Sequence, residues 1–176
     1  MLQHTVKNMR HRSDSGFIFL EIIIATVLIG LVFIMLMGIG FSSLTVTGAI
    51  QKATQIDSLI KEELEAVRSF RDGTTWLTDG LGVANTGSTN PYYLELDTTV
   101  TPPKWKLVSG TETVGAFTRK VIFDKVSRDT ATNNIESTYN IAHDDPDTRQ
   151  VTVIIASTSN SASTYQVMQY LTNWNK

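Results

Sequence analysis

Near the start of the chain, the residue whose type and position most clearly indicate a chemical role is Glu21, a carboxylate inside an apolar run. Residues 17–41 are almost wholly apolar, and Glu21 is the only charged residue between Asp14 and Lys52. A carboxylate at the centre of a membrane costs about 2.5–3.5 kcal/mol, and less near the interface. Such a residue is expected to have a partner that neutralises it, so Glu21 is the first candidate functional residue.

A second group of carboxylates, Asp144, Asp145 and Asp147, surrounds Pro146. Clustered oxygens are the ligands that Ca²⁺ prefers, so these three residues are a weak calcium candidate, the one cofactor the sequence offers. The spacing of an EF-hand loop is absent, and such Asp-Pro sequences also suit solvated turns. We expect the neighbouring His143 to be a loop residue and not a general base.

The composition excludes several classes of chemistry. The sequence contains no cysteine, which rules out disulfides, Cys-ligated zinc, iron–sulfur clusters and thiol catalysis. It has no nucleophile elbow, phosphate-cradling glycine loop or metal-binding helix motif. The net charge is −2, with no basic region large enough to predict nucleic-acid binding. We therefore expect a protein that is not an enzyme and has no nucleic-acid partner.

The distribution of charge around the apolar run predicts its orientation in a membrane. Lys7, Arg10 and Arg12 precede the run, and no basic residue lies within it. The positive-inside rule then places residues 1–16 in the cytoplasm and the later residues outside. The run is long enough to cross a bilayer. It fits a secretory signal cleaved after Gly40, a plain single-pass anchor, or a leader that is removed just before the run.

Gly16 and Phe17, followed by Glu21, form a motif that favours the third interpretation. It resembles the class III signal of type IV prepilins and type II secretion pseudopilins. In that family a glycine precedes the cleavage site, a hydrophobic residue (usually Phe) follows it, and a Glu lies at the fifth mature position. The short, basic leader at residues 1–16 has the same character. Residues 62–72 and 170–174 are also similar to segments of minor pilins.

The resemblance implies a role for each residue of this motif. A prepilin peptidase would cleave after Gly16 on the cytoplasmic face and methylate the new amine of Phe17. The absence of a side chain at Gly16 lets a protease approach the bond closely. Glu21 would neutralise the Phe17 amine of its own or a neighbouring subunit during assembly. The implied partners are the peptidase, other pilin or pseudopilin subunits, an inner-membrane assembly platform and membrane lipid.

The elements that must position these residues are predicted by periodicity. Beyond the apolar run, one stripe of a continuing amphipathic helix is formed by Ile56, Leu59, Ile60, Leu64, Val67 and Phe70. We expect one helix over residues 17–72, with a membrane segment at 17–41 and a stop at Asp72–Gly73, where the glycine suits a left-handed cap. The stripe should pack on the chain's own head.

The remaining residues, 73–176, predict a β-rich head. Residues 80–90 are expected to form a loop, and the predicted strands cover residues 92–96, 105–108, 117–126, 150–156 and 165–171. The expected fold class is α+β: a long helix, transmembrane in its upper half, packed by its lower half on an antiparallel sheet as in pilins. The aromatic residues Tyr170 and Trp174, near the end of the chain, are expected to pack in the core or at the edge of the sheet.

Two functions from different classes follow from this organisation. The first is a structural subunit, a minor pilin or pseudopilin of a type IV pilus or type II secretion filament. It would cross the bacterial inner membrane once and then join a filament at the cell surface or in the periplasm. The second is a single-pass, membrane-anchored binding module outside the cytoplasm. A simple anchor needs neither Gly16–Phe17 nor Glu21, so the motif favours the first.

Overall fold

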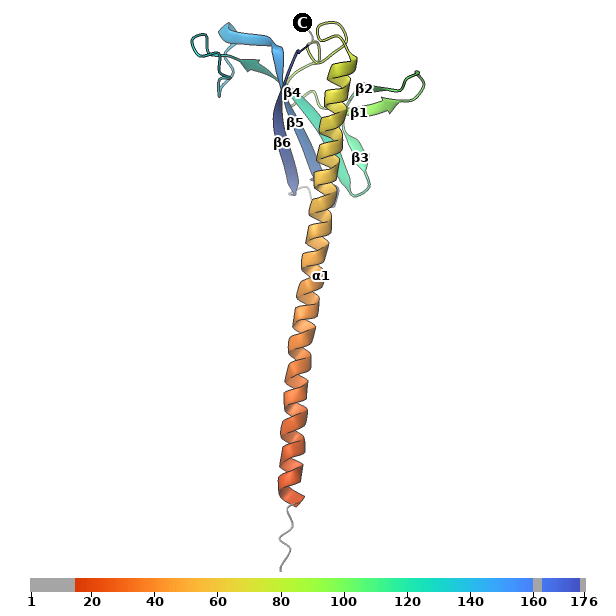
Figure 1. Cartoon of the computed structure of the whole chain (residues 1–176), viewed down its shortest axis with the longest axis vertical. Coiled ribbons are helices and arrows are strands. Elements are labelled where there is room, and N and C mark those ends of the chain that lie inside the picture. Colours follow the sequence, from red (N-terminus) through yellow and green to blue (C-terminus); the bar gives the residue numbers. More distant parts are fainter. Residues whose placement is uncertain (1–14, 160–162, 175–176) are drawn as a thin grey trace, which may run out of the picture. The chain divides into compact units, whose positions relative to one another are not determined.

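The fold begins with one long helix, α1 (Ser15–Gly73), which continues for 59 residues (Figure 1). The structure is a computed structural model that describes residues 15–159 and 163–174. Most of the expected leader, residues 1–14, lies outside the described residues. The helical segment contains no proline, so each residue can donate the hydrogen bond that an α-helix requires.

The chain divides into two compact units within α1, between Gln51 and Lys52. Lys52 is also the first charged residue after Glu21, so the division falls where the apolar half of the helix ends. The first unit contains only the apolar part of α1 among the described residues. The second contains the last turns of α1 and every described strand.

The second unit is built around an antiparallel sheet of six strands. They are β1 (Tyr92–Asp97), β2 (Lys104–Ser109), β3 (Glu112–Val114), β4 (Phe117–Ser127), β5 (Asp144–Ser157) and β6 (Thr164–Thr172), with a short 3-10 helix, η1 (Ile141–His143), before β5. Their order across the sheet is β2-β1-β4-β5-β6, and β3 pairs with β4. The predicted α+β class is confirmed.

The core lies between one stripe of α1 and one face of the sheet. Ile56, Ile60, Val67 and Phe70 of the predicted stripe are buried, and Leu59 and Leu64 are partly buried beside them. The sheet contributes buried side chains at alternate positions, among them Leu94, Val121, Phe123, Val151, Val153 and Ile155. The prediction that the lower half of the helix packs on the head is therefore confirmed.

The end of α1 differs from the prediction. The described glycines with positive φ are Gly87, Gly110 and Gly115, so Gly73 does not form a left-handed cap. Instead the hydroxyl of Thr74 donates to the carbonyl of Phe70 at 2.7 Å and satisfies one of the last helical carbonyls.

Five of the strands lie where the alternation of residues predicts them, and two differences remain. Strand β3 has three residues, too few for a periodic pattern to identify. Strand β5 begins at Asp144 and not at residue 150, so the interpretation of Asp144 and Asp145 as loop residues is wrong. They pair with Ser127 and Val126 of β4 beyond a register shift. Polar contacts stabilise this first part of β5, and such contacts cannot be predicted from the alternation of hydrophobic residues.

Candidate functional site

The apolar half of α1 has an uncovered surface. From Phe17 to Gln51 every side chain is exposed, and the exposed fraction of Phe17 itself is 78%. Soluble proteins rarely leave such a continuous apolar surface in water. The helix is long and apolar enough to cross a membrane. This part of the chain therefore requires lipid or other protein to cover it.

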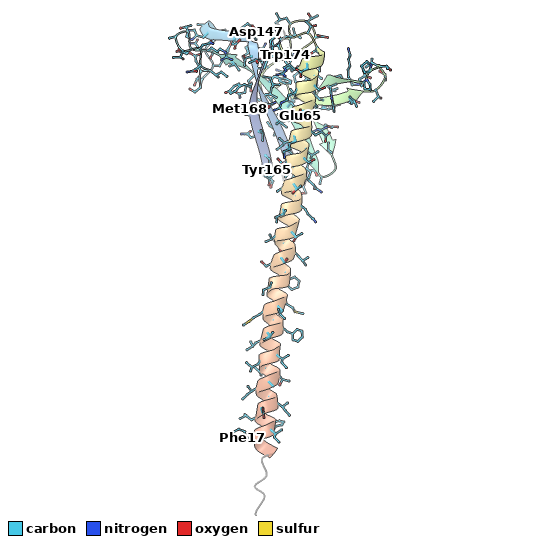
Figure 2. The ribbon with its side chains drawn as sticks, viewed as in Figure 1. Phe17, Glu65, Asp147, Tyr165, Met168 and Trp174 are labelled. Carbon is cyan, nitrogen blue, oxygen red and sulfur yellow. The ribbon has the colours of Figure 1, made fainter. Side chains whose placement is uncertain are left out.

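Glu21 belongs to one face of this apolar segment. Phe17, Leu20, Glu21, Ile24, Ala25 and Leu28 line a shallow groove along the helix. Residues four apart lie one above the other on a helix, and side chains lean toward its N-terminus. The side chain of Glu21 therefore leans toward the turn that contains Phe17, the residue that Figure 2 labels near the start of α1. An amine at residue 17 would lie on the side toward which Glu21 leans.

The polar groups of this segment differ in whether the helix itself satisfies them. Thr26 donates to the carbonyl of Ile22 at 2.6 Å, and Thr45 donates to the carbonyl of Phe41 at 3.1 Å. Such local bonds make hydroxyl groups tolerable in a membrane. Within the described part of the chain, the carboxylate of Glu21 has no hydrogen-bond or ion-pair partner. Any partner of this carboxylate would come from outside these residues.

Gly16 and Phe17 of the processing motif lie in the first turns of α1. The leader residues that precede this helix fall outside the described part of the chain. The proposed cleavage and methylation therefore remain predictions from the motif.

The calcium candidates do not converge on one point. Asp144 accepts a hydrogen bond from the hydroxyl of Tyr139. Asp145 accepts from Arg128 Nε at 2.6 Å and from the hydroxyl of Thr148 at 2.7 Å.

The third carboxylate of this group, Asp147, accepts from the side chain of Asn173 at 3.1 Å. Among the described residues, no group of three or more acidic or histidine side chains is arranged to hold a metal. The calcium site stays a prediction.

His143, expected in a loop, ends the 3-10 helix η1. Its Nδ1 lies 3.0 Å from Glu136 Oε1. The histidine and glutamate therefore satisfy each other locally.

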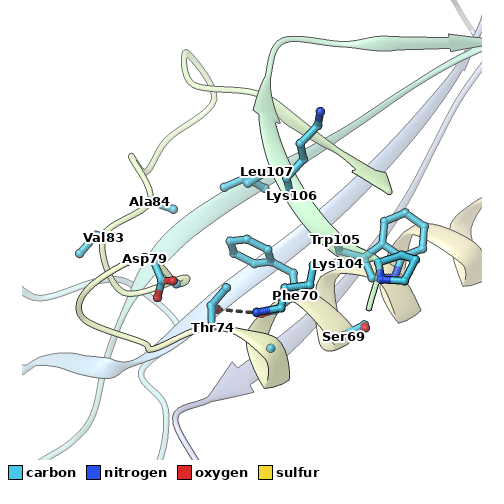
Figure 3. Close-up of a pocket in the computed structure, with 13 residues that line it drawn as sticks. Ser69, Phe70, Thr74, Asp79, Val83, Ala84, Lys104, Trp105, Lys106 and Leu107 are labelled. Carbon is cyan, nitrogen blue, oxygen red and sulfur yellow. Dashed lines mark hydrogen bonds between the residues drawn. The ribbon is translucent and has the colours of Figure 1, made fainter. Parts of the chain in front are cut away.

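Beside the end of α1 the head has a cavity of about 530 Å³, a size that could hold a small ligand (Figure 3). Phe70, Trp105 and Leu107 supply apolar walls. Its polar groups serve the local fold: Asp79 accepts from the Thr75 N–H at 2.7 Å, for example.

A buried charged cluster is the feature that the sequence analysis missed. Glu63 of α1 and Arg119 of β4 are both buried, and Arg119 Nε lies 3.0 Å from Glu63 Oε2 and 2.7 Å from Glu112 Oε2. Glu62 Oε1 lies 3.1 Å from Arg119 Nη1. The other oxygen of Glu63 accepts from the Leu94 N–H at 3.0 Å. The cluster therefore connects α1 with three strands.

The ionic contacts in this cluster are imperfect. Glu63 Oε2 and Arg119 Nη1 lack a well-aligned hydrogen bond despite their short ionic distances. Burial raises the pKa of Glu63 to about 7, against the opposing attraction of Arg119 and the Leu94 N–H. The spacing could have identified this residue, because Glu63 falls on the buried stripe between Ile60 and Val67. A carboxylate in a core position is a signal of a buried partner.

Comparison of the chain with protein-family models, with curated proteins and with solved structures finds no match in any of the three.

Proposed function

We propose that this protein is a structural subunit of a filament, a minor pilin or pseudopilin of a type IV pilus or type II secretion system. The observation that carries the proposal is the position of Glu21. It is a carboxylate without a partner among the described residues, on an exposed apolar helix, and it leans toward the turn of Phe17. Removal of residues 1–16 would create a cationic amine at that turn.

The energetics explain why the pair would matter for assembly. A single buried charge in an apolar environment costs several kcal/mol, and an oppositely charged partner offsets most of that cost. A Glu21 paired with a Phe17 amine, in the same or a neighbouring subunit, would leave no isolated charge in the packed helices. When the amine belongs to a neighbouring subunit, the pair also sets the register of the two subunits.

The uncovered surface from Phe17 to Ile50 supports the same proposal. Lipid covers it while the subunit resides in the inner membrane, with its N-terminus in the cytoplasm and its head outside. Equivalent helices cover it in the filament. The partners are then a prepilin peptidase that cleaves after Gly16 and methylates Phe17, other subunits, and the assembly platform.

The intact mass and N-terminal sequence of the protein from membranes of its native host test this function. A chain that starts at Phe17 with a methylated amine is the expected result. A chain that retains residues 1–16 would instead support the anchored binding module. A chain that starts after Gly40 would identify a secreted protein and overturn the proposal.

A further inference from the structure

The two edges of the sheet differ in charge. At one edge, β2 carries Lys104 and Lys106, and Lys106 lies 3.3 Å from Glu95 of β1. Lysine on an edge strand discourages pairing with other chains. At the other edge, β6 runs for nine residues with no charged residue, no proline and no glycine (Figure 1). The β6 edge therefore lacks the protection that β2 has.

Two backbone hydrogen bonds at the ends of β6 show which of its alternate residues bond to β5. The Asn173 N–H donates to the Asp147 carbonyl at 2.8 Å, and the Ser157 N–H donates to the Ser163 carbonyl at 3.2 Å. These two pairs continue the β5–β6 register by one residue at each end. In an antiparallel ladder such bonded pairs recur at every second residue. The odd-numbered residues of β6 therefore bond to β5.

The intervening residues have their backbone groups on the open side. The N–H and C=O groups of Gln166, Met168 and Tyr170 point away from β5. No further strand lies beyond β6 among the residues that the structure describes. These three residues form a regular row of donors and acceptors with the spacing that an added strand requires.

Both faces of the sheet carry exposed apolar side chains along this edge. Tyr165 and Val167 lie on the face that packs against α1, and their exposed fractions are 44% and 39%. Met168 and Tyr170 lie on the opposite face, with exposed fractions of 53% and 41%. An added strand would cover apolar surface on both sides as well as backbone groups.

We propose that β6 is a docking edge for an extended segment of a different protein chain, which joins the sheet as an antiparallel strand. Main-chain hydrogen bonds provide the affinity in this mode of recognition, and alternate side chains provide the specificity. The segment carries no charged residue opposite β6, because a charge there would lose water without gaining a partner. Its side chains are β-branched or aromatic, the types that pair well across strands with Tyr165 and Val167.

Strand β2 of a second copy of this chain would pair poorly with β6. Strand β2 would bring Lys104 and Lys106 against the uncharged β6. Pairing of β6 with the β6 of a second copy is a separate outcome, which the experiment below distinguishes.

The experiment uses the full chain in its native host with a photoreactive benzophenone side chain in place of Gln166. After irradiation, the crosslinked peptide is identified by mass spectrometry. The expected adduct maps to a segment of another protein that has no charged residue over about six positions. An adduct with a second copy of β6, with lipid alone or with a charged segment would overturn the proposal, as would the absence of any adduct.

A proline in place of Met168 supplies the matched variant. Because the Met168 N–H faces the open edge, Met168→Pro removes a donor to the docked strand and leaves the β5–β6 ladder intact. The adduct should fall at least tenfold, while tryptophan fluorescence reports an unchanged head. If the proline variant does not fold, Met168→Lys retains the N–H and adds an unpaired charge, and it should give the same loss. An undiminished adduct in a folded variant contradicts strand addition.

Discussion

Glu63 of α1 and Arg119 of β4 meet inside the head, where Glu63 Oε2 lies 3.0 Å from Arg119 Nε and both side chains are buried. The contact fixes the helix on the sheet at a point where the surrounding core is apolar. Burial outweighs the attraction of the arginine, so the pKa of Glu63 rises to about 7. The packing of α1 on the sheet should therefore depend on pH.

The first prediction is that the head becomes less stable as the pH rises from about 4.5 to 7. Folded Glu63 binds its proton more tightly than unfolded Glu63, whose pKa is near 4.5. The stabilisation is thus complete below the unfolded pKa and is lost as the pH rises through the folded pKa. The shift corresponds to at most about 3 kcal/mol in the free energy of unfolding. All three tryptophans lie in the head, so their fluorescence during denaturant unfolding measures it.

Two glutamine variants separate this effect from other titrations. Glu63→Gln should flatten the pH profile over that range, because the buried side chain no longer ionises. Glu65→Gln changes an exposed glutamate on the same helix and should leave the profile unchanged. The pKa of Asp72 and that of Asp145 are lowered, so these carboxylates affect stability only at lower pH. Parallel profiles for the wild type and Glu63→Gln would contradict the assignment.

Much of the fold could be predicted from the sequence because its elements follow simple periods. The stripe from Ile56 to Phe70 repeats every three to four residues, and the strand at residues 150–156 alternates with period two. Strand β3 and the start of β5 were not predicted, because hydrogen bonds and ion pairs of Glu112 and Asp145 hold them in place. Contacts between residues that are distant in the sequence produce no periodic pattern in it, so periodicity cannot predict them.

The candidate functional residues also differ in whether the sequence alone identifies them. Glu21 could be identified because a charge within an apolar run is visible in the sequence. Glu63 lies on the same periodic stripe as Ile60 and Val67, but it was missed because its charged neighbours made it resemble part of an exposed polar face. The docking edge of β6 depends on which strand ends the sheet, and the order of strands is a property of the tertiary fold.

The second prediction concerns Gly82, which approaches Trp76 closely. A Cβ at Gly82 would lie 2.5 Å from the Trp76 carbonyl oxygen, closer than real contacts allow. Gly82→Ala should therefore destabilise the head by about 1–3 kcal/mol, the usual cost of overpacking. Gly73→Ala is the control, since nothing lies within 4 Å of that position and alanine favours a helix. Equal stability of the two variants in denaturant unfolding would show that the close approach is not a constraint.

The third prediction concerns processing at Gly16. Gly16→Val places a branched side chain at the bond that the peptidase must approach, and the intact mass from native membranes should then include residues 1–16. Gly38→Val introduces the same side chain elsewhere in the apolar run, where nothing lies within 4 Å, and should leave processing intact. Cleavage of the Gly16→Val chain at the original bond would argue against recognition of this motif.

The fourth prediction concerns the position of the carboxylate in α1. Glu21→Gln should insert into the membrane normally, because the neutral amide costs less to bury than a charge. Its incorporation into filaments should fall at least tenfold, a loss equivalent to about 1.4 kcal/mol, because the partner amine is left without its counter-charge. Sheared filaments and the membrane fraction are compared by quantitative immunoblot.

Moving the carboxylate along the helix tests whether assembly requires the charge at residue 21 or only a charge on this face of the helix. The double variant Glu21→Leu with Leu28→Glu retains one carboxylate on the same face of the helix, since both residues line the same groove. Its carboxylate is about two turns farther from Phe17, beyond the reach of an amine at that residue. The variant should therefore enter the membrane and fail to assemble, as Glu21→Gln does. Assembly at the wild-type level would mean that the charge does not act through Phe17, and the proposed pairing would be wrong.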